Sequence, residues 1–279
     1  MLINFTKMNS QGNNFMLVDL VKEKLILSED DIHKIIQKSE DNFDQLLLIN
    51  FKFNSNSIYC QIYNSDGSKA YQCGNGLRAI MLYLNEKYNY SKIVVDIENV
   101  KYSVTINDQK EITASMGESR SFRLIDNNVH YQNSLERQNI LIDSIKKSVG
   151  FYLIDLGNKH CVIVDQFDNY EKSIITNFFD NYYSNLLNLE FVDNPKDLFD
   201  FNCGHFTINV YEAGAGWTKS CGSGATAVAS LFYEIHGAQV CDKLIFIKQK
   251  GGELTIKKKN KNLLLIGPST IEFEGKLNV

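Results

Sequence analysis

The chain of 279 residues lacks several features that mark particular classes of protein. It has no apolar run close to the roughly 20 residues that a membrane-spanning helix needs. Its first residues, MLINFTKMNSQGNNF, lack the charged, apolar and small-residue segments of a signal peptide. The formal net charge is −4, so no basic excess indicates binding to nucleic acid or to an anionic membrane. These absences predict a cytoplasmic protein without nucleic-acid or membrane partners.

Cysteine and proline patterns exclude further classes. None of the six cysteines lies in the Cys-x-x-Cys spacing of a zinc ribbon, and they are too scattered for the disulfide framework of a small secreted protein. With only two prolines and no shift in composition, no linker is evident. The 44% of hydrophobic and 22% of charged residues are typical of a globular protein with a sizeable core.

An internal repeat is the most informative feature of the sequence. Cys73, in YQCGNGLRAIMLYL, and Cys221, in KSCGSGATAVASLFYEI, each precede Gly-x-Gly and an apolar run, 148 residues apart. The same offset places Asn64 on Glu212. A looser pair, SQGNNF and DLGNKH, puts Gly-Asn after a strand-like segment in each half. Because strand-like and helix-like segments alternate around both motifs, we expect two halves of like construction.

Each Cys-Gly-x-Gly segment is typical of the start of a helix. Glycine permits a tight turn and the close approach of a ligand to the backbone. The first N–H groups of a helix have no acceptor within it, so together with the helix dipole they can bind an anion. A cysteine at such a position is expected to have a lowered pKa and to react as a thiolate. One segment alone would equally suit a phosphate-binding turn or a capped helix with a buried cysteine.

Two such segments in equivalent positions suggest a more specific chemistry. If the two halves pack face to face, both helix N-termini can converge on one anionic group with a thiol on either side. One thiolate would remove the proton from a carbon next to a carboxylate, and the opposite thiol would deliver a proton to the other face. The helix N–H groups would stabilise the negative charge that develops. The N–H groups concerned belong to Gly74, Asn75, Gly222 and Ser223.

These motifs resemble those of the diaminopimelate epimerase family, the cofactor-independent two-cysteine amino-acid racemases. The resemblance covers nearly the whole chain and rests on FTKMNSQGNNFMLVD, NSDGSKAYQCGNGLR, GNKHCVIV, NLEFV, VYEAGAGWTKSCGSGA and GGELTI. It implies an α/β (α+β) fold of two pseudo-symmetric halves, each a curved, mostly antiparallel sheet around a central apolar helix, with the active site in the cleft between them. The implied halves are residues 1–117 with 266–279, which carry Cys73, and residues 118–265, which carry Cys221.

The resemblance also implies roles for single residues. Cys73 and Cys221 match the acid/base pair, His160 matches the histidine that assists the first cysteine, and Glu212 matches the glutamate that assists the second. No cofactor and no metal are expected, the substrate would be a small amino acid, and members of the family often form homodimers. The residues matched to the substrate pocket are Asn13, Gln45, Asn64, Asn158 and Asn188, and those matched to the carboxylate cradle are Gly74, Asn75, Gly222 and Ser223.

One departure from the family bears on the substrate. The family has Arg-Gly-x-Gly-Glu-Thr where this chain has Ala213-Gly-Ala-Gly-Trp217-Thr. That arginine pairs with the distal carboxylate of diaminopimelate, and alanine cannot form such a charge-assisted pair. The first hypothesis is epimerisation of LL- to meso-diaminopimelate, for lysine and peptidoglycan biosynthesis. The distal carboxylate would then be held by Asn64, Asn158 and Asn188 and by a lysine such as Lys159 or Lys219. The second is racemisation of an amino acid without a distal carboxylate, such as histidine or another basic amino acid, with Trp217 shaping the pocket.

Interpretations from other classes stay open on the residues alone. Cys73, Cys221 and His160 would suit a zinc ion, although no fourth ligand is evident. Two glycine-rich helix starts would suit a non-catalytic phosphate-binding module, and the pattern does not exclude a pyridoxal phosphate enzyme. The remaining cysteines are expected to be packing residues. The last strand-like segment, STIEFEGKLNV, is expected to return to the first half.

Overall fold

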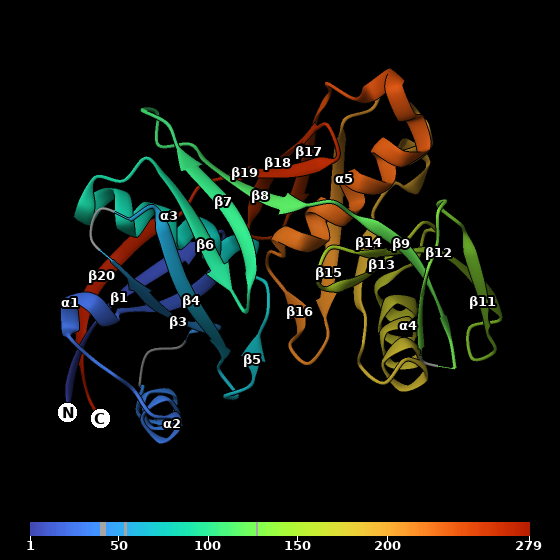
Figure 1. Cartoon of the computed structure of the whole chain (residues 1–279). Helices are drawn as coiled ribbons and strands as arrows, with labels where there is room; N and C mark the ends of the chain where they lie inside the picture. The colour runs from blue at the N-terminus through green and yellow to red at the C-terminus, as the bar shows by residue number, and fades with distance from the viewer. Residues whose placement is uncertain (40–42, 53–54, 127) are drawn as a thin grey trace. The chain divides into compact units, whose positions relative to one another are not determined.

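The computed structural model describes residues 1–39, 43–52, 55–126 and 128–279. The chain divides into two compact units, one formed by Met1–Ser115 with Ile266–Val279 and the other by Met116–Leu265 (Figure 1). Within the described part of the chain, none of the helices combines the length and the apolar character that crossing a bilayer would require.

The first unit is a mostly antiparallel sheet associated with one long helix. Its elements are β1 (Leu2–Ser10), β2 (Asn13–Asp19), α1 (Leu20–Glu23), α2 (Glu29–Lys38), β3 (Gln45–Phe51), β4 (Ser57–Asn64), β5 (Lys69–Ala70), α3 (Gly74–Tyr88), β6 (Lys92–Ile97), β7 (Val100–Ile106), β8 (Ile112–Gly117) and β20 (Thr270–Asn278).

The strands of this unit pair in the order β20-β1-β2-β3-β4-β6-β7-β8, with β5 beside β4. The pairs β2/β3 and β4/β6 are parallel, and the other pairs are antiparallel. Because a parallel pair needs a crossover connection, helices lie between these strands in the chain: α1 and α2 join β2 to β3, and α3 joins β4 to β6. The pairing of β20 with β1 confirms that the last strand returns to the first half.

The second unit repeats this plan. Its elements are β9 (Arg120–Ile125), β10 (Asn128–Tyr131), β11 (Gln138–Ile142), β12 (Lys147–Asp155), β13 (Lys159–Ile163), α4 (Asn169–Tyr182), β14 (Asn188–Val192), η1 (Pro195–Phe199), β15 (His205–Glu212), β16 (Gly216–Thr218), α5 (Gly222–His236), η2 (Gly237–Val240), β17 (Leu244–Gln249), β18 (Gly252–Lys259) and β19 (Asn262–Gly267).

Strands of the second unit pair in the order β11-β12-β13-β14-β15-β17-β18, with β9 also on β12, β10 on β9 and β16 on β15. Its parallel pairs, β13/β14 and β15/β17, are joined through α4 and α5. The sequence offset of 148 is reproduced to the residue: β4 corresponds to β15, and α3 corresponds to α5. The predicted mixed α/β fold, with two halves of like construction, is confirmed.

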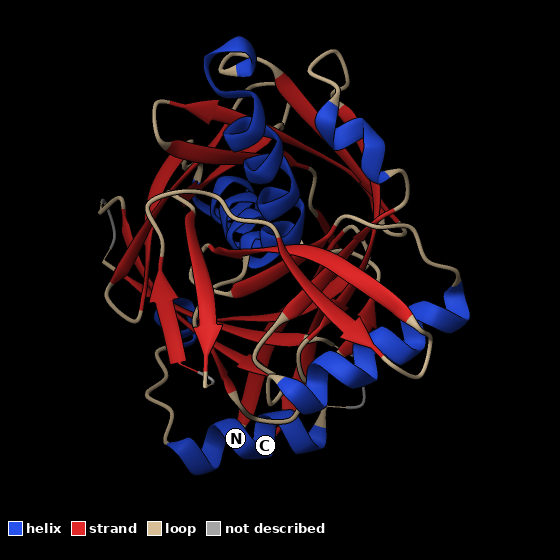
Figure 2. Cartoon of the chain, turned by 90° about the vertical axis from the view of Figure 1, so that its right-hand side faces the viewer, coloured by secondary structure: helices blue, strands red, loops and turns tan. Residues whose placement is uncertain are grey.

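Each unit has a buried helix on one face of its sheet and an amphipathic helix on the other. All residues of α3 from Gly74 to Leu84 and of α5 from Gly222 to Tyr233 are buried, as expected for helices that the strands enclose (Figure 2). The opposite sheet faces form separate cores, to which α2 contributes in the first unit and α4 in the second. Since side chains alternate along a strand, a residue's position decides which helix it faces.

The enclosed helix should determine the stability of its unit. We expect Ile80→Ala, at a fully buried position of α3, to lower the free energy of unfolding by about 2–5 kcal/mol, because truncation removes apolar contacts and leaves a cavity. Urea unfolding followed by circular dichroism measures this loss. The control Ile26→Ala, at a position that is 99% exposed, should change the free energy by no more than about 0.5 kcal/mol. Equal losses in the two variants would contradict the assignment of α3 as the core helix.

Candidate active site

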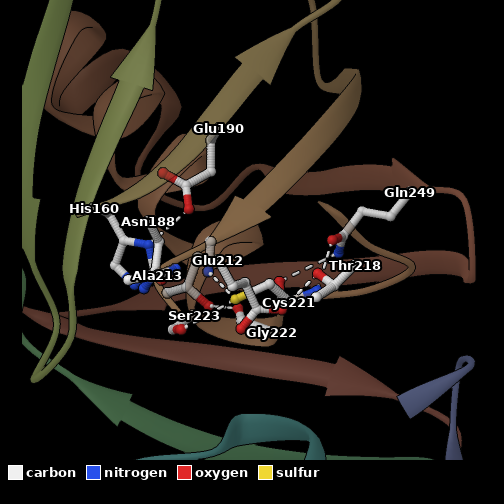
Figure 3. A network of polar contacts seen from close by, with 12 residues as sticks. His160, Asn188, Glu190, Glu212, Ala213, Thr218, Cys221, Gly222, Ser223 and Gln249 are labelled. Carbon is white, nitrogen blue, oxygen red and sulfur yellow. Dashed lines mark hydrogen bonds and ion pairs between the residues drawn. The ribbon is translucent and has the colours of Figure 1, made fainter. Parts of the chain in front are cut away.

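Strand alternation directs three polar side chains of the second unit toward α5. In β13, Val162 belongs to the core around α5 and Cys161 to the core around α4, so His160 lies on the α5 face. The apolar residues two positions away from Glu190 in β14 and from Glu212 in β15 also belong to the α5 core. Figure 3 shows the three side chains gathered near the start of α5.

Cys221 is the N-cap of α5. Its backbone is extended, with φ −124°, and its Sγ accepts the N–H of Gly224 at 3.3 Å. The Cys221 N–H donates to Oε1 of Gln249 at 2.8 Å, and the amide of Gln249 donates back to the carbonyl of Cys221 at 3.3 Å. The Sγ also lies 3.4 Å from Oγ of Ser223. The thiol is therefore held by hydrogen bonds at the point where the helix N–H groups begin (Figure 3).

The electrostatics around Cys221 contradict the expectation of a lowered thiol pKa. Burial raises the pKa of Cys221 well above its usual range, and the carboxylates of Glu212 and Glu190 raise it further. The hydrogen bonds from Ser223 and Gly224 act in the opposite direction but do not outweigh burial. A helix N-terminus usually lowers the pKa of a cysteine. Here burial of the thiol and the two nearby carboxylates outweigh that effect. Burial and the two carboxylates therefore favour the protonated thiol of Cys221 over the thiolate.

His160 and Glu190 form a fully buried pair on adjacent parallel strands. Nδ1 of His160 lies 2.7 Å from Oε1 of Glu190, and both side chains have no exposed surface. Burial raises the pKa of Glu190, and His160 counteracts this shift. A Cβ added to Gly224 would lie only 2.6 Å from Oε1 of Glu190, which is closer than real Cβ atoms approach a neighbour. The second glycine of Cys-Gly-Ser-Gly is thus needed to make room for this carboxylate.

The turn before His160 is tied to a buried aspartate. Oδ1 of Asp155 accepts the N–H of Gly157 at 2.7 Å, and the positive φ of Gly157, 99°, is one that glycine adopts readily. Asn158 and His160 follow directly. Nζ of Lys159 lies 2.9 Å from Oδ2 of Asp155, so this lysine anchors the turn. The suggestion that Lys159 binds a distal carboxylate of the substrate is not supported by this contact.

The residues around Ala213, which replaces the family arginine, form contacts within β14, β15 and β16. Oδ1 of Asn188 accepts the N–H of Ala213 at 2.9 Å, which leaves the amide N–H₂ of Asn188 as its donor. Glu212 accepts a 2.5 Å hydrogen bond from Thr218. Trp217 packs against Phe191 and Tyr211, which belong to the core under α4. These contacts place the Trp217 ring on the α4 face of the sheet and do not support the suggestion that it shapes the pocket.

The first unit has an equivalent polar group on the α3 face of its sheet. Asn13, Gln45 and Asn64 each lie two positions from an apolar residue of the α3 core. Nε2 of Gln45 donates to Oδ1 of Asn64 at 2.9 Å, and Nδ2 of Asn64 donates to Oγ of Ser68 at 3.0 Å. Oδ1 of Asn13 and Oε1 of Gln45 are buried and have no hydrogen-bond partner among the described residues. Such acceptors suit a ligand with donor groups.

Cys73 is the N-cap of α3, as Cys221 is of α5. It is half-buried, has φ −153°, and its Sγ accepts the N–H of Gly76 at 3.2 Å. Arg78, one turn further along, is fully buried; it donates to Oδ1 of Asn75 at 3.0 Å and to the carbonyl of Pro268 at 3.3 Å. Burial lowers the pKa of Arg78 to about 10, while the interaction with Cys73 raises it. A guanidinium thus accompanies the thiol of the first unit.

Sequence reasoning missed several of these residues. Glu190, Thr218, Gln249 and Arg78 all hold or accompany the residues that were singled out. One signal in the sequence could have revealed Glu190: in NLEFV it takes the strand position that faces the central helix, where an apolar residue is the rule.

The other cysteines follow expectation except Cys241, which is exposed at the end of η2; Cys60 and Cys161 are fully buried. Among the described residues, no cluster of three or more potential ligands could hold a metal ion.

Comparison with known proteins agrees with this architecture. A hydroxyproline epimerase from Agrobacterium vitis, solved with bound trans-4-OH-L-proline, matches 99% of this chain with 90% of its own at a TM-score of 0.68 and 10% identity. The fold is thus one that racemases and epimerases use. Curated diaminopimelate epimerases from Blochmanniella floridana and Wigglesworthia glossinidia brevipalpis are 27% and 29% identical over 99% of this chain and the whole of theirs.

The family model described as diaminopimelate epimerase matches residues 5–122 and 152–271. The chain belongs to the diaminopimelate epimerase family, and it is an isomerase of the epimerase and racemase class.

The paired glycines of the two motifs should respond differently to alanine. We expect Gly224→Ala to lower the free energy of unfolding by about 1–3 kcal/mol, because its Cβ would press on the Glu190 carboxylate that His160 holds in place. Gly76→Ala is the matched control: its Cβ would meet Leu47 and Cys73 at 3.3–3.4 Å, and the gain in helix propensity offsets this crowding, so the change should stay within about 1 kcal/mol. Thermal unfolding of both variants measures the difference, and a larger loss in Gly76→Ala would refute it.

The raised pKa of Cys221 should be visible in its reactivity. In wild-type protein we expect slow alkylation of Cys221 by iodoacetamide at pH 8, rising with pH, because little thiolate is present. Glu212→Gln removes a negative charge that raises this pKa, so the pKa should fall and alkylation at pH 8 should accelerate several-fold. Mass spectrometry of the Cys221 peptide gives the rate, with the exposed Cys241 as the internal reference. Slower alkylation in the variant would show that the carboxylate does not act electrostatically.

Proposed function

We propose that the chain inverts the Cα of an amino acid by transferring protons through two cysteines, without pyridoxal phosphate. The observation that carries this proposal is the equivalence of Cys73 and Cys221: each is the N-cap of a buried helix, 148 residues apart, and each accepts the N–H of the second glycine of its motif. Two thiols in the same local geometry suit one reaction that needs a proton removed from one face of a carbon and delivered to the other.

The roles follow from the surroundings of each thiol. Cys221, kept protonated by burial and by Glu212 and Glu190, serves as the acid in the resting enzyme. Cys73, accompanied by the buried Arg78 guanidinium, serves as the base. The negative charge on the carboxylate of the substrate increases as the α-proton leaves, and the first N–H groups of both helices are suited to stabilise it. In the reverse reaction the two thiols exchange roles. The cradle would consist of the N–H groups of Gly74, Asn75, Gly222 and Ser223.

For the substrate we propose diaminopimelate, converted from the LL to the meso form, which would place the enzyme in lysine and peptidoglycan biosynthesis. The names of the curated relatives support this choice. The alternative, a racemase for histidine or another basic amino acid, rests on Ala213, since Lys159 is engaged by Asp155 and Trp217 faces the other core. The amide N–H₂ of Asn188 and the side-chain carbonyl acceptors of Asn13 and Gln45 can serve either substrate. A cytoplasmic location and a homodimer remain predictions.

Deuterium exchange at Cα tests both the proposed reaction and the proposed substrate. Purified protein is incubated in D₂O with LL-diaminopimelate and, separately, with a panel of L-amino acids that includes histidine and lysine. We expect exchange and inversion with diaminopimelate, and loss of activity on the order of 10²–10⁴-fold in Cys73→Ser and in Cys221→Ser, because each change removes a proton-transfer group. Cys241→Ser, at an exposed position, is the matched control and should remain active.

The other outcomes distinguish the remaining interpretations. Exchange only with a basic amino acid would select the racemase. Stoichiometric zinc in purified protein would favour the metal site, and an absorption band between roughly 330 and 420 nm would indicate pyridoxal phosphate. Ligand binding without exchange, unaffected by Cys73→Ser, would indicate the binding module and contradict the proposal.

A further inference from the structure

We propose that Glu190 is a positioning residue for the proposed reaction: it fixes the tautomer and the orientation of His160, so that Nε2 of His160 is the free proton acceptor of the site. The inference rests on the proposed proton transfer for its catalytic meaning, but the tautomer itself is a property of the unliganded chain. No role for Glu190 follows from the match of the motifs, which singled out His160 and Glu212.

The geometry of the pair carries the first step. Nδ1 of His160 and Oε1 of Glu190 are 2.7 Å apart, and neither side chain has any exposed surface. A neutral imidazole has one N–H donor and one acceptor nitrogen, and the hydrogen bond made by one nitrogen determines the state of the other. A carboxylate at Nδ1 accepts a proton, so Nδ1 carries the hydrogen and Nε2 carries the lone pair.

The second step concerns Nε2. This atom is buried and has no hydrogen-bond partner among the described residues. The same is true of Oε2 of Glu190. A buried polar atom without a partner is rare in folded proteins and often belongs to a functional site. His160 lies on the sheet face that carries Glu212 and that faces the start of α5 (Figure 3). The acceptor Nε2 of His160 therefore lies on the α5 face of the sheet, and the donor Nδ1 is held by Glu190.

The third step is why a carboxylate is present here. A buried charge destabilises a fold unless it is paired, and an apolar side chain would serve packing alone better. Glu190 lies at the N-terminus of α5, next to Gly224, where the helix dipole favours negative charge. The titratable groups that face it are His160 from β13, Glu212 from β15 and Cys221 from α5. A carboxylate that holds one nitrogen of a histidine, so that the other nitrogen can accept a proton, follows the logic in which a third group orients a catalytic base.

The tautomer is measured directly by long-range ¹H–¹⁵N correlation NMR of protein labelled with ¹⁵N-histidine. At pH 8 we expect the His160 ring to show the Nδ1–H tautomer, with the signal assigned by its loss in His160→Gln. In Glu190→Gln the amide can donate to Nδ1, so the signal should change to the Nε2–H tautomer. In the epimerisation assay kcat should fall roughly tenfold or more with little change in KM, because the acceptor at Nε2 is lost while substrate contacts remain. Glu190→Asp, which keeps the charge, should retain the wild-type tautomer and part of the activity.

The controls separate this role from a merely structural one. Asp165→Asn removes another carboxylate of the same unit, bonded to the Gly150 N–H and to Arg137, and should leave both readouts unchanged. His236, whose Nε2 is 2.9 Å from the carbonyl of Leu198, reports the integrity of the unit in every spectrum. An Nε2–H tautomer in wild-type protein, or an unchanged tautomer and kcat in a folded Glu190→Gln, would overturn the proposal. Because the wild-type spectrum needs no substrate and only the His160→Gln variant for its assignment, it decides the tautomer even if Glu190→Gln does not fold or the substrate is another compound.

Discussion

The rest of this structure depends on one constraint: in each unit the N-terminus of the central helix is buried among the strands. A helix N-terminus carries N–H groups without acceptors, and burial deprives them of water. In α3 and α5 the cysteine at the N-cap supplies one acceptor through its sulfur. The remaining N–H groups make the position suited to an anion, and the glycines that follow each cysteine keep side chains out of the way. The proposed carboxylate cradle would thus use the same buried N–H groups that each fold must accommodate.

The two units use one plan with opposite electrostatics. In the first unit the fully buried charge near the thiol is the guanidinium of Arg78, whereas in the second it is the carboxylate of Glu190. The position of Arg78 corresponds under the repeat to Thr226, whose hydroxyl only bonds back to the carbonyl of Gly222. A duplicated framework therefore presents one thiol in a cationic setting and one in an anionic setting. For the proposed reaction, this difference favours Cys73 as the thiolate and Cys221 as the thiol before the substrate binds.

Much of this arrangement could be predicted from the sequence, for a physical reason. The offset between Cys73 and Cys221 is preserved because the strand, turn and helix around each cysteine form one local unit, so local patterns suffice to place them. What could not be predicted depends on the neighbours that the fold brings in. The pKa of Cys221 is raised by burial and then by carboxylates from other strands, and Lys159 is bound by an aspartate across a hairpin. The direction of Trp217 depends on its pairing with Tyr211, which no local pattern specifies.

The return of β20 to β1 makes the first unit discontinuous, with the whole of the second unit inserted into it. On the ribosome, residues 1–115 emerge before β20, so the edge of β1 opposite β2 stays unpaired until β20 is released. The second unit is continuous and can be completed earlier. The order of completion is thus the reverse of the order of synthesis, and in the interval the open edge of β1 is a template onto which a strand of another chain could pair.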